Sequence, residues 1–451
     1  EYTQYHGGTV IDGLIGLITA VNRVNSIYER ETAVRLELVA ANDQIIFTDP
    51  VTDGYHNSDA LISIGQNQTI LDSVIGSDNY DIGHLFSTGS GGLAQGGAVC
   101  ESGRKAQATT GLSSPEGDAF YVDYLAHEIG HQFGARHSFN GDSGGCAYGL
   151  TPENAYEPGS GSTIMAYAGL CSSQNLQASS DPYFHADSLN SIRNFAAAHP
   201  TCGETMEPLN VAPTITAIVT DGLTIPANTP FALTATATDP DSDSLTYAWE
   251  QMDLGPAGDP ITPTGDAPLF RSFTPTTDPS RTLPALQTLL GDGAWPIGER
   301  LPSTTRSLHF RLTVRDNRGY PTGGAVAMAD VAINVEETAG PFALLRPKTA
   351  VLWSIDSPQE IQWAVANTDQ SPINCSHVQI TLSHDGGWTY PTVLAAHEPN
   401  DGAAMVQFDE VGINGRLKIA CENNIFFALS TGNITLHAGE TQHLYLPFIQ
   451  R

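Results

Sequence analysis

Residues 126–140 read AHEIGHQFGARHSFN, and the spacing of the polar side chains in this stretch decides how the surrounding chain must fold. On a helix, His127 and His131 lie one turn apart on the same face, so both imidazoles can bind one metal ion with Glu128 beside them. A helix continued to His137 would place it roughly 9 Å beyond His131, whereas a Zn–N bond spans only about 2.1 Å. The pattern therefore predicts that the helix ends before His137.

Gly134 is the position at which this helix can end, because glycine adopts the left-handed conformation at a helix C-terminus without a steric penalty. His137 can then turn back as a third ligand. Three neutral histidines leave one zinc position open, which is the catalytic arrangement. Glu128 can take a proton from water bound there and pass it to the leaving amine. We therefore expect peptide-bond hydrolysis, with a chance HExxH on a surface helix or a metal other than zinc as alternatives.

Length and composition limit the class of protein and its partners. The chain has 451 residues, enough for two to four domains, and its 44 glycines, 28 prolines and 15% charged residues suit a secreted protein rich in strands and loops. A net charge of −30 repels nucleic acid and anionic membranes, so we expect neither as a partner. No apolar run approaches the roughly 20 residues that span a bilayer. No signal segment precedes Glu1, so we expect a mature product; the oligomeric state stays open, with a monomer as the expectation.

The six cysteines are widely spaced and contain no CxxC pair. An even number in each part of the chain predicts disulfides and an oxidising, extracellular compartment. The four in the first part allow three pairings, and their spacing does not choose among them, whereas the two in the last part are expected to pair. The first part contains Cys100, Cys146, Cys171 and Cys202, and the last part contains Cys375 and Cys421.

Helical and strand patterns are mixed ahead of the histidines. Apolar side chains recur at helical spacing in some segments and alternate in others. This mixture predicts an α+β domain in which a mixed sheet packs on helices, with Asp118 as the N-cap of the histidine helix. Helices are expected over 8–28, 58–75 and 120–133, and extended segments over 34–38, 45–47 and 82–86.

Two glycine-containing segments flank the histidine helix in the sequence. Residues 91–99, GGLAQGGAV, are typical of a strand nearly bare of large side chains, where another backbone can approach closely. In a protease that backbone would be substrate lying along an edge strand, and an ordinary glycine-rich loop is the alternative. Residues 159–167, GSGSTIMAY, place Met165 in a tight apolar segment. Beneath a zinc site such a segment would be a Met-turn.

HEIGHQFGARH followed by STIMAY resembles the metzincin clan of zinc endopeptidases, and the neighbouring residues resemble its reprolysin (adamalysin) branch in the bacterial secreted form. The resemblance covers about the first 200 residues and implies zinc as the cofactor and proteins or peptides as substrates. GGLAQGGAVC resembles the edge strand on which reprolysins bind the substrate backbone. The chain departs from the branch at Ser138, where reprolysins usually carry Asp. The disulfides implied by the resemblance join Cys100 to Cys202 and Cys146 to Cys171.

Tyr167, two residues after Met165, resembles the tyrosine that astacins and serralysins place near zinc. There it can ligate the ion or stabilise the oxyanion, and a core tyrosine is the alternative. His84 and His185 lack ligand spacing and are expected to be packing or surface residues.

After a linker at 203–213 the pattern changes to alternation, without a long helical stripe. We therefore expect two all-β sandwich domains after the catalytic domain, the first resembling Ig-like and cadherin-like modules with a long insertion at 255–307. Asp239, Asp241 and Asp243 place carboxylates at alternate positions on a turn of this first sandwich, which predicts a structural Ca²⁺ site or, alternatively, a solvated turn. The predicted domains are 1–203, 204–339, 340–438 and a C-terminal tail over 439–451.

The sequence as a whole predicts a secreted zinc endopeptidase. Its catalytic residues would be Glu128 and Tyr167. The alternative is a secreted adhesin or a glycan- or protein-binding scaffold with a vestigial zinc domain. An intact base and three intact ligands argue against that alternative.

Overall fold

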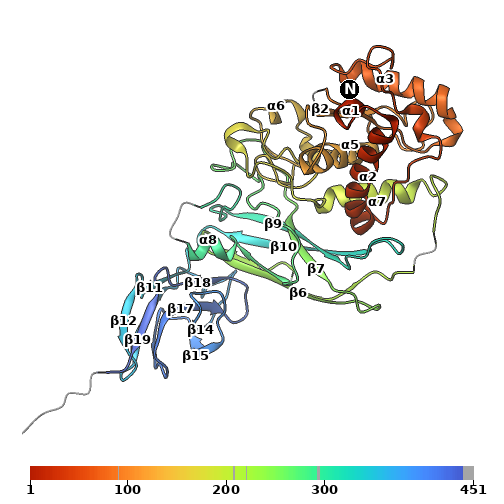
Figure 1. Cartoon of the computed structure of the whole chain (residues 1–451). Coiled ribbons are helices and arrows are strands. Elements are labelled where there is room, and N and C mark those ends of the chain that lie inside the picture. Colours follow the sequence, from red (N-terminus) through yellow and green to blue (C-terminus); the bar gives the residue numbers. More distant parts are fainter. Residues whose placement is uncertain (90, 207–208, 220, 292–294, 440–451) are drawn as a thin grey trace, which may run out of the picture. The chain divides into compact units, whose positions relative to one another are not determined.

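The computed structural model describes residues 1–451 except 90, 207–208, 220, 292–294 and 440–451 (Figure 1). The chain forms two compact units. These units do not coincide with the predicted domains, since parts of residues 204–339 fall in each unit. The domain boundaries at 203 and 339 remain predictions. The predicted tail, after its first residue, lies outside the described residues. Unit 1 comprises Glu1–Val219, Thr234–Ser280 and His309–Val331, and unit 2 comprises Thr220–Leu233, Arg281–Leu308 and Ala332–Arg451.

Unit 1 begins with α1 (Tyr2–Tyr5) and the 23-residue α2 (Val10–Thr32). Thr9 starts α2 with a capping box, because its hydroxyl accepts from the Asp12 amide while the Asp12 carboxylate accepts from the Thr9 amide. Length and composition alone would let α2 cross a bilayer, which is weak evidence for a membrane span. We regard it as a core helix because several of its side chains are fully buried in the main core of unit 1: Ala20, Val24, Ile27 and Tyr28.

A small mixed sheet lies in the same unit. Strands β1 (Leu85–Ser87), β2 (Gly91–Ala94) and β3 (Ala108–Gly111) follow the order β1-β3-β2. β1 runs parallel to β3, and β2 runs antiparallel to it with Gly92 opposite Thr110. The expected mixed sheet is therefore present, and β2 is an edge strand.

The strands predicted over 34–38 and 45–47 are wrong. Residues 34–39 belong to no strand, and the second segment begins in a 3₁₀ turn, Asn42–Ile45. The Asn25 side chain takes the place of a neighbouring strand, since its amide exchanges two hydrogen bonds of 2.8 Å with the backbone of Leu36. The alternating pattern thus indicates that one face of the segment is buried, but it does not show whether a neighbouring strand pairs with it.

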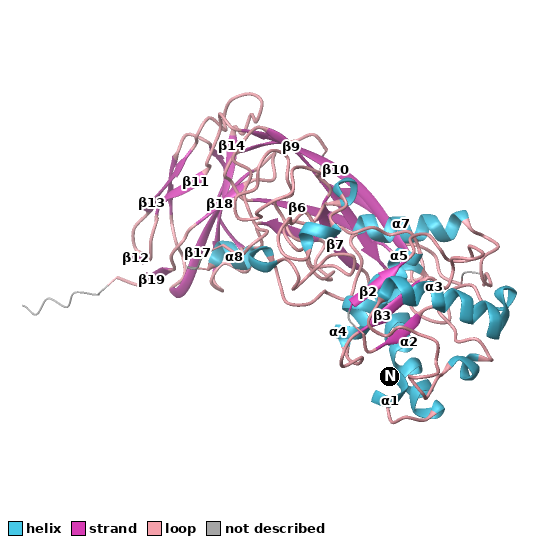
Figure 2. Ribbon diagram, turned by 90° about the horizontal axis from the view of Figure 1, so that it is seen from above, coloured by secondary structure: helices cyan, strands magenta, loops and turns pink. Residues whose placement is uncertain are grey.

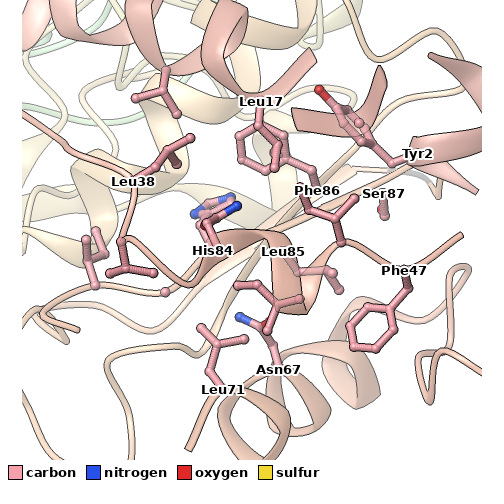
Figure 3. A pocket seen from close by; sticks show the side chains of 18 of the residues that line it. Tyr2, Leu17, Leu38, Phe47, Asn67, Leu71, His84, Leu85, Phe86 and Ser87 are labelled. Carbon is pink, nitrogen blue, oxygen red and sulfur yellow. The ribbon is translucent and has the colours of Figure 1, made fainter. Parts of the chain in front are cut away.

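A cavity of about 200 Å³ adjoins this unpaired segment (Figure 3). Leu38 lines it on one side and Phe86 on another. Leu125 and Ile129 also line it, and they lie about half a helical turn from the histidines. The cavity is therefore separate from the face of the helix that carries the predicted metal ligands.

The remaining helices of unit 1 complete its core. α3 (Ala60–Leu71) continues into the π-helical turn Asp72–Gly76, and α7 (Ala186–Ala198) closes the region. Figure 2 shows helices gathered around the small sheet and strands predominating in the later part of the chain. Two disulfides, Cys100 to Cys202 and Cys146 to Cys171, join the pairs that the resemblance implied. The histidine helix contributes Val122, Leu125, Ala126 and Ile129 to the main core of unit 1, and other buried members of that core are Ile164, Phe184, Leu189 and Ile192.

Later strands also contribute to unit 1. β4 (Thr214–Ile218) pairs antiparallel with β6 (Phe231–Thr238), and β7 (Thr246–Gln251) pairs antiparallel with β9 (Arg306–Arg315). β6 alternates buried and exposed side chains, as its sequence predicts. β4 and β7 lie wholly in the same compact unit as the helices, as do the later parts of β6 and β9, from Thr234 and His309 onward.

A buried ion pair connects α2 with β9. The Arg315 Nε donates to Glu31 at 2.9 Å, and both side chains are 1% exposed. The same guanidinium donates to the carbonyl of Phe184 at 3.1 Å. Removing one member of such a pair leaves a buried charge, at a cost of about 3–5 kcal/mol.

Unit 2 is rich in strands. The end of β10 (Val326–Glu336) pairs parallel with β5 (Thr224–Pro226). The described residues of the predicted insertion include β8 (Ser280–Leu283) and α8 (Leu286–Leu290). Two further sheets follow the orders β11-β13-β16 and β12-β19-β17-β14-β15, with β18 on β17. Cys375 pairs with Cys421, as expected. The strands of these two sheets are β11 (Ala343–Arg346), β12 (Val351–Ser354), β13 (Gln359–Ala364), β14 (His377–Ser383), β15 (Thr392–Pro399), β16 (Ala403–Val406), β17 (Gly412–Cys421), β18 (Phe427–Leu429) and β19 (Ile434–His437).

Candidate metal centre

The histidine helix has three consecutive parts. These are α4 (Asp118–Phe120), a π-helical segment (Tyr121–Ala126) and α5 (His127–Gln132). The prediction of Asp118 as N-cap is wrong, because Asp118 is the first helical residue and its carboxylate pairs with Arg23 at 2.8 Å.

The end of the helix follows the prediction. Gly134 has φ +85°, and its amide donates to the carbonyl of His131 at 2.8 Å. This left-handed glycine turns the chain back, so that His137 rejoins the face of α5 that carries His127 and His131. One ligand atom from each of the three histidines lies within 4.8 Å of the others.

Each imidazole is oriented by a backbone carbonyl. His127 Nδ1 donates to Ile164 at 2.7 Å, and His131 Nδ1 donates to Ala135 at 2.8 Å. His137 Nδ1 donates to Gly149 at 2.5 Å. A carbonyl can only accept, so each Nδ1 carries the proton and each Nε2 is left with a free lone pair when the ring is neutral.

The charge state of the rings follows from their burial. Burial lowers the pKa of all three histidines, and that of His131 falls to about 3, so the rings are neutral at pH 7. The Nε2 atoms of His131 and His137 are 3.0 Å apart, and neither has a proton to donate to the other. A cation between such atoms satisfies both lone pairs. Three neutral nitrogen donors with carbonyl-bound second nitrogens are the donor set that zinc takes in catalytic sites.

Glu128 lies beside this group and is buried, with 6% of its surface exposed. Burial raises the pKa of its carboxyl to about 8. Gly92 on the edge strand β2 lies against it, since a Cβ added there would be 2.2 Å from Glu128 Oε1. The glycine-rich sequence indicated a close approach at this strand, but not that the approaching group is the carboxylate of Glu128.

Residues 1–195 match the family model described as Metallo-peptidase family M12B, reprolysin-like. Over these residues the chain is therefore a reprolysin-like zinc metallopeptidase region. The match ends close to the end of α7 and so covers the helices and the small sheet of the metallopeptidase rather than its later strands.

Other comparisons add little about the metallopeptidase. No curated protein matches it. Solved structures that align include Sidekick-1 immunoglobulin domains 1–5 (14% identity, TM-score 0.16, 50% of this chain and 38% of that one). A chimeric titin Z1Z2 aligns at 10% identity and TM-score 0.16, over 51% of this chain and 99% of that one. Chicken CNTN1 FN1-FN3 domains align at 11% identity and TM-score 0.18, over 48% of this chain and 62% of that one. Similarity at these TM-scores supports no conclusion about fold or function.

Met165 and Tyr167 both lie next to the histidines of the metallopeptidase. Met165 is fully buried, and a Cβ added at Gly130 would be 2.5 Å from its sulfur, so the methionine packs directly against α5. The Tyr167 ring centroid is 4.5 Å from that of His137. The sequence analysis did not identify Gly130 as a contact residue. A glycine inside a helix was the available signal, because it indicates that another group packs closely there.

The predicted calcium ligands do not all come together. Asp239 and Asp243 cluster with Asp316, with ligand atoms within 4.8 Å of one another. Asp241 is outside this cluster, because its carboxylate accepts from the Val211 amide at 2.7 Å. Asp316, just after β9, is far away in the sequence, and the local spacing of aspartates could not indicate it.

His84 and His185 are packing residues, as expected. His84 is bonded on one nitrogen to Gln132 at 2.9 Å and on the other to Thr110 at 2.8 Å, and burial lowers its pKa to about 4. His185 caps α7 by accepting from the Asp187 amide at 3.2 Å.

Proposed function

We propose that the metallopeptidase is a secreted endopeptidase in which His127, His131 and His137 hold zinc and Glu128 is the general base. The observation that supports this best is the pair of Nε2 atoms 3.0 Å apart in a buried site, each on a ring whose other nitrogen is committed to a carbonyl. Zinc bound there would polarise the scissile carbonyl and acidify water. Met165, packed against α5, would be the Met-turn residue.

Glu128 would carry the proton through the reaction. Its carboxylate would accept a proton from the attacking water and then donate it to the leaving nitrogen. Burial raises the pKa of this carboxyl, which favours its holding the proton between the two steps. Tyr167 would donate a hydrogen bond to the developing oxyanion, and its pKa, raised to about 12 by burial, keeps the hydroxyl protonated.

The substrate backbone would lie along β2. Among the described strands, β2 pairs only with β3, so its other edge is available to an extended peptide. Gly91 and Gly92 leave the strand without side chains at the point where it approaches Glu128. This arrangement would place a peptide bond next to the base.

The three disulfides support secretion, since disulfides persist in oxidising compartments. The predicted sandwich domains, a monomeric state and the exclusion of nucleic acid and membrane partners also remain proposals. Calcium remains a proposal for a changed ligand set of Asp239, Asp243 and Asp316. In its favour, Asp239 Oδ2 is buried without a hydrogen-bond partner.

The proposed function is tested by cleavage of unfolded casein by the full chain and by Glu128→Ala, at matched zinc content. The wild type should cleave casein, and Glu128→Ala should be about 10²–10⁴-fold slower while still binding zinc. Full activity of Glu128→Ala would refute the role of the base. Absence of cleavage by a zinc-loaded wild type would favour a narrow processing enzyme or a binding scaffold.

A further inference from the structure

We propose that Glu157 is a positioning residue that fixes the third histidine and the carbonyl behind the first, and that its buried charge complements the metal. This inference rests on the proposed assignment of His127, His131 and His137 as zinc ligands. Glu157 does not belong to the HExxHxxGxxH pattern, and it follows that pattern by 20 residues.

The Glu157 carboxylate accepts several hydrogen bonds in a buried position, and the residue is 1% exposed. Its Oε1 accepts from the Ser138 hydroxyl at 2.7 Å and from the Thr163 hydroxyl at 2.5 Å. Its Oε2 accepts from the Ser162 amide at 2.8 Å and from the Thr163 amide at 3.3 Å. Both oxygens are therefore used, and they draw together two segments that are far apart in sequence.

One of these segments adjoins a proposed ligand, and the other adjoins a residue that contacts one. Ser138 directly follows His137, so the bond from its hydroxyl fixes the chain that carries the third imidazole. Thr163 directly precedes Ile164, whose carbonyl accepts from His127 Nδ1 at 2.7 Å. One carboxylate thus connects to two of the three rings, to His137 through Ser138 and to His127 through Thr163 and Ile164.

The backbone reinforces the same connection. The Glu157 amide donates to the Ser138 carbonyl at 2.8 Å, and the Glu157 carbonyl accepts from Asn140 at 2.7 Å. The Ser138 amide in turn donates to the Met165 carbonyl at 3.2 Å. The side chain of Glu157 is therefore held in one place by its own backbone pairing, as a positioning group must be.

The charge of Glu157 needs an explanation of its own. In the described part of the chain, the donors to this carboxylate are hydroxyls and amides of Ser138, Ser162 and Thr163, and none of them is a Lys, Arg or His. A buried carboxylate held only by hydroxyls and amides is costly unless an opposite charge is near. Three neutral histidines leave a divalent cation without charge compensation. Glu157, bonded to the residue after His137, would compensate part of the charge of such a cation.

Ser138 stands where members of the resembling branch usually carry Asp. In this chain the residue after the third histidine can offer only a hydroxyl, and the carboxylate comes from residue 157 instead. The two positions are in direct contact, so moving the acid from one to the other is a test of the proposal.

The test measures the zinc dissociation constant of the full chain by competition with a chromogenic chelator, together with kcat and KM on casein. Glu157→Gln keeps the size of the side chain and removes its charge. We expect about 10–100-fold weaker zinc binding and a fall in kcat that exceeds any change in KM. The matched control is Asp385→Asn in unit 2, whose carboxylate also accepts from two amides, those of Trp388 and Thr389, and it should leave zinc binding unchanged.

The swap distinguishes positioning by charge from simple packing. Ser138→Asp alone places a second carboxylate beside Glu157 and should weaken zinc binding, whereas Ser138→Asp combined with Glu157→Gln should recover at least half of the lost affinity on a logarithmic scale. Unchanged zinc affinity in a folded Glu157→Gln protein, judged by circular dichroism, would overturn the proposal, as would additive losses in the double variant. If the wild type itself fails to bind zinc, the ligand assignment fails instead, so the two failures are distinguishable.

Discussion

The histidine centre and the aspartate cluster are both groups of three potential metal ligands in unit 1, but they differ in what already satisfies the ligand atoms. In the histidine centre, the Nε2 atoms of His131 and His137 face each other at 3.0 Å without a proton between them. In the aspartate cluster, the Arg318 guanidinium already donates to Asp243 at 2.6 Å, and the Ala325 amide donates to Asp316 at 3.0 Å. Two ring nitrogens of the histidine centre thus have no proton between them, whereas protein donors already serve much of the aspartate cluster.

Removing one histidine should have the largest effect. His131→Ala takes away one of the two facing nitrogens, so bound zinc should fall from one equivalent to near zero and casein cleavage should be lost. The control is His384→Ala, an exposed histidine of unit 2, which should keep both zinc and activity. Metal content is measured after desalting. One retained equivalent of zinc in His131→Ala would remove the difference between the two clusters.

A methyl group at Gly92 should have the next largest effect. In Gly92→Ala the added Cβ would be only 2.2 Å from Glu128 Oε1, so the carboxylate would have to move. We therefore expect kcat on casein to fall by about 10²-fold with zinc still bound. The control is Gly65→Ala in α3, where an added Cβ meets no atom within 4 Å. That variant should keep full activity and gain up to about 1 kcal/mol of stability. Equal activity of the two variants would contradict the proposed contact between edge strand and base.

Histidine burial predicts a pH dependence of stability. The pKa of His84 is about 4 in the folded state and about 6.5 in the unfolded state, so His84 favours folding fully above pH 6.5 and progressively less as the pH falls towards 4. The free energy of unfolding of zinc-loaded protein, from urea titrations, should drop between pH 7 and pH 5. His84→Gln should make that drop smaller by about 2 kcal/mol. An identical drop in the variant would show that His84 titrates normally in the folded protein.

The smallest effect is expected from calcium. If the aspartate cluster binds Ca²⁺, a concentration of about 100 Kd should stabilise the protein by about 2.7 kcal/mol. Asp239→Asn should abolish this rise in melting temperature, and Asp241→Asn should not, because Asp241 lies outside the cluster. If the melting temperature of the wild type is the same with and without Ca²⁺, the calcium site is refuted, and only the histidine centre remains a proposed metal site.

These two clusters also show what the sequence can and cannot predict. The spacing of His127, His131, Gly134 and His137 is local, so helix geometry and one left-handed glycine were enough to bring the rings together. Asp316 joins the aspartate cluster through the pairing of β7 with β9, which local spacing does not encode.

Contacts made by single side chains could not be predicted from the sequence either. The predicted strand at 34–38 fails because one amide side chain, Asn25, takes the place of a partner strand. Asp118 does not cap its helix because Arg23 pairs with it from α2. Glu157 reaches Ser138 only through a loop whose path depends on the whole fold. Hydrophobic and motif patterns report which face is buried, but the partner of a polar group is set by tertiary contacts.

The central claim is that the three facing imidazoles hold zinc, and X-ray absorption at the zinc edge of the zinc-loaded wild-type chain tests it most directly. We predict three nitrogen ligands at about 2.0–2.1 Å and one oxygen ligand, with the nitrogen signal lost in His131→Ala. A coordination shell of oxygen alone, or a shell unchanged in His131→Ala, would place the metal elsewhere and contradict the account.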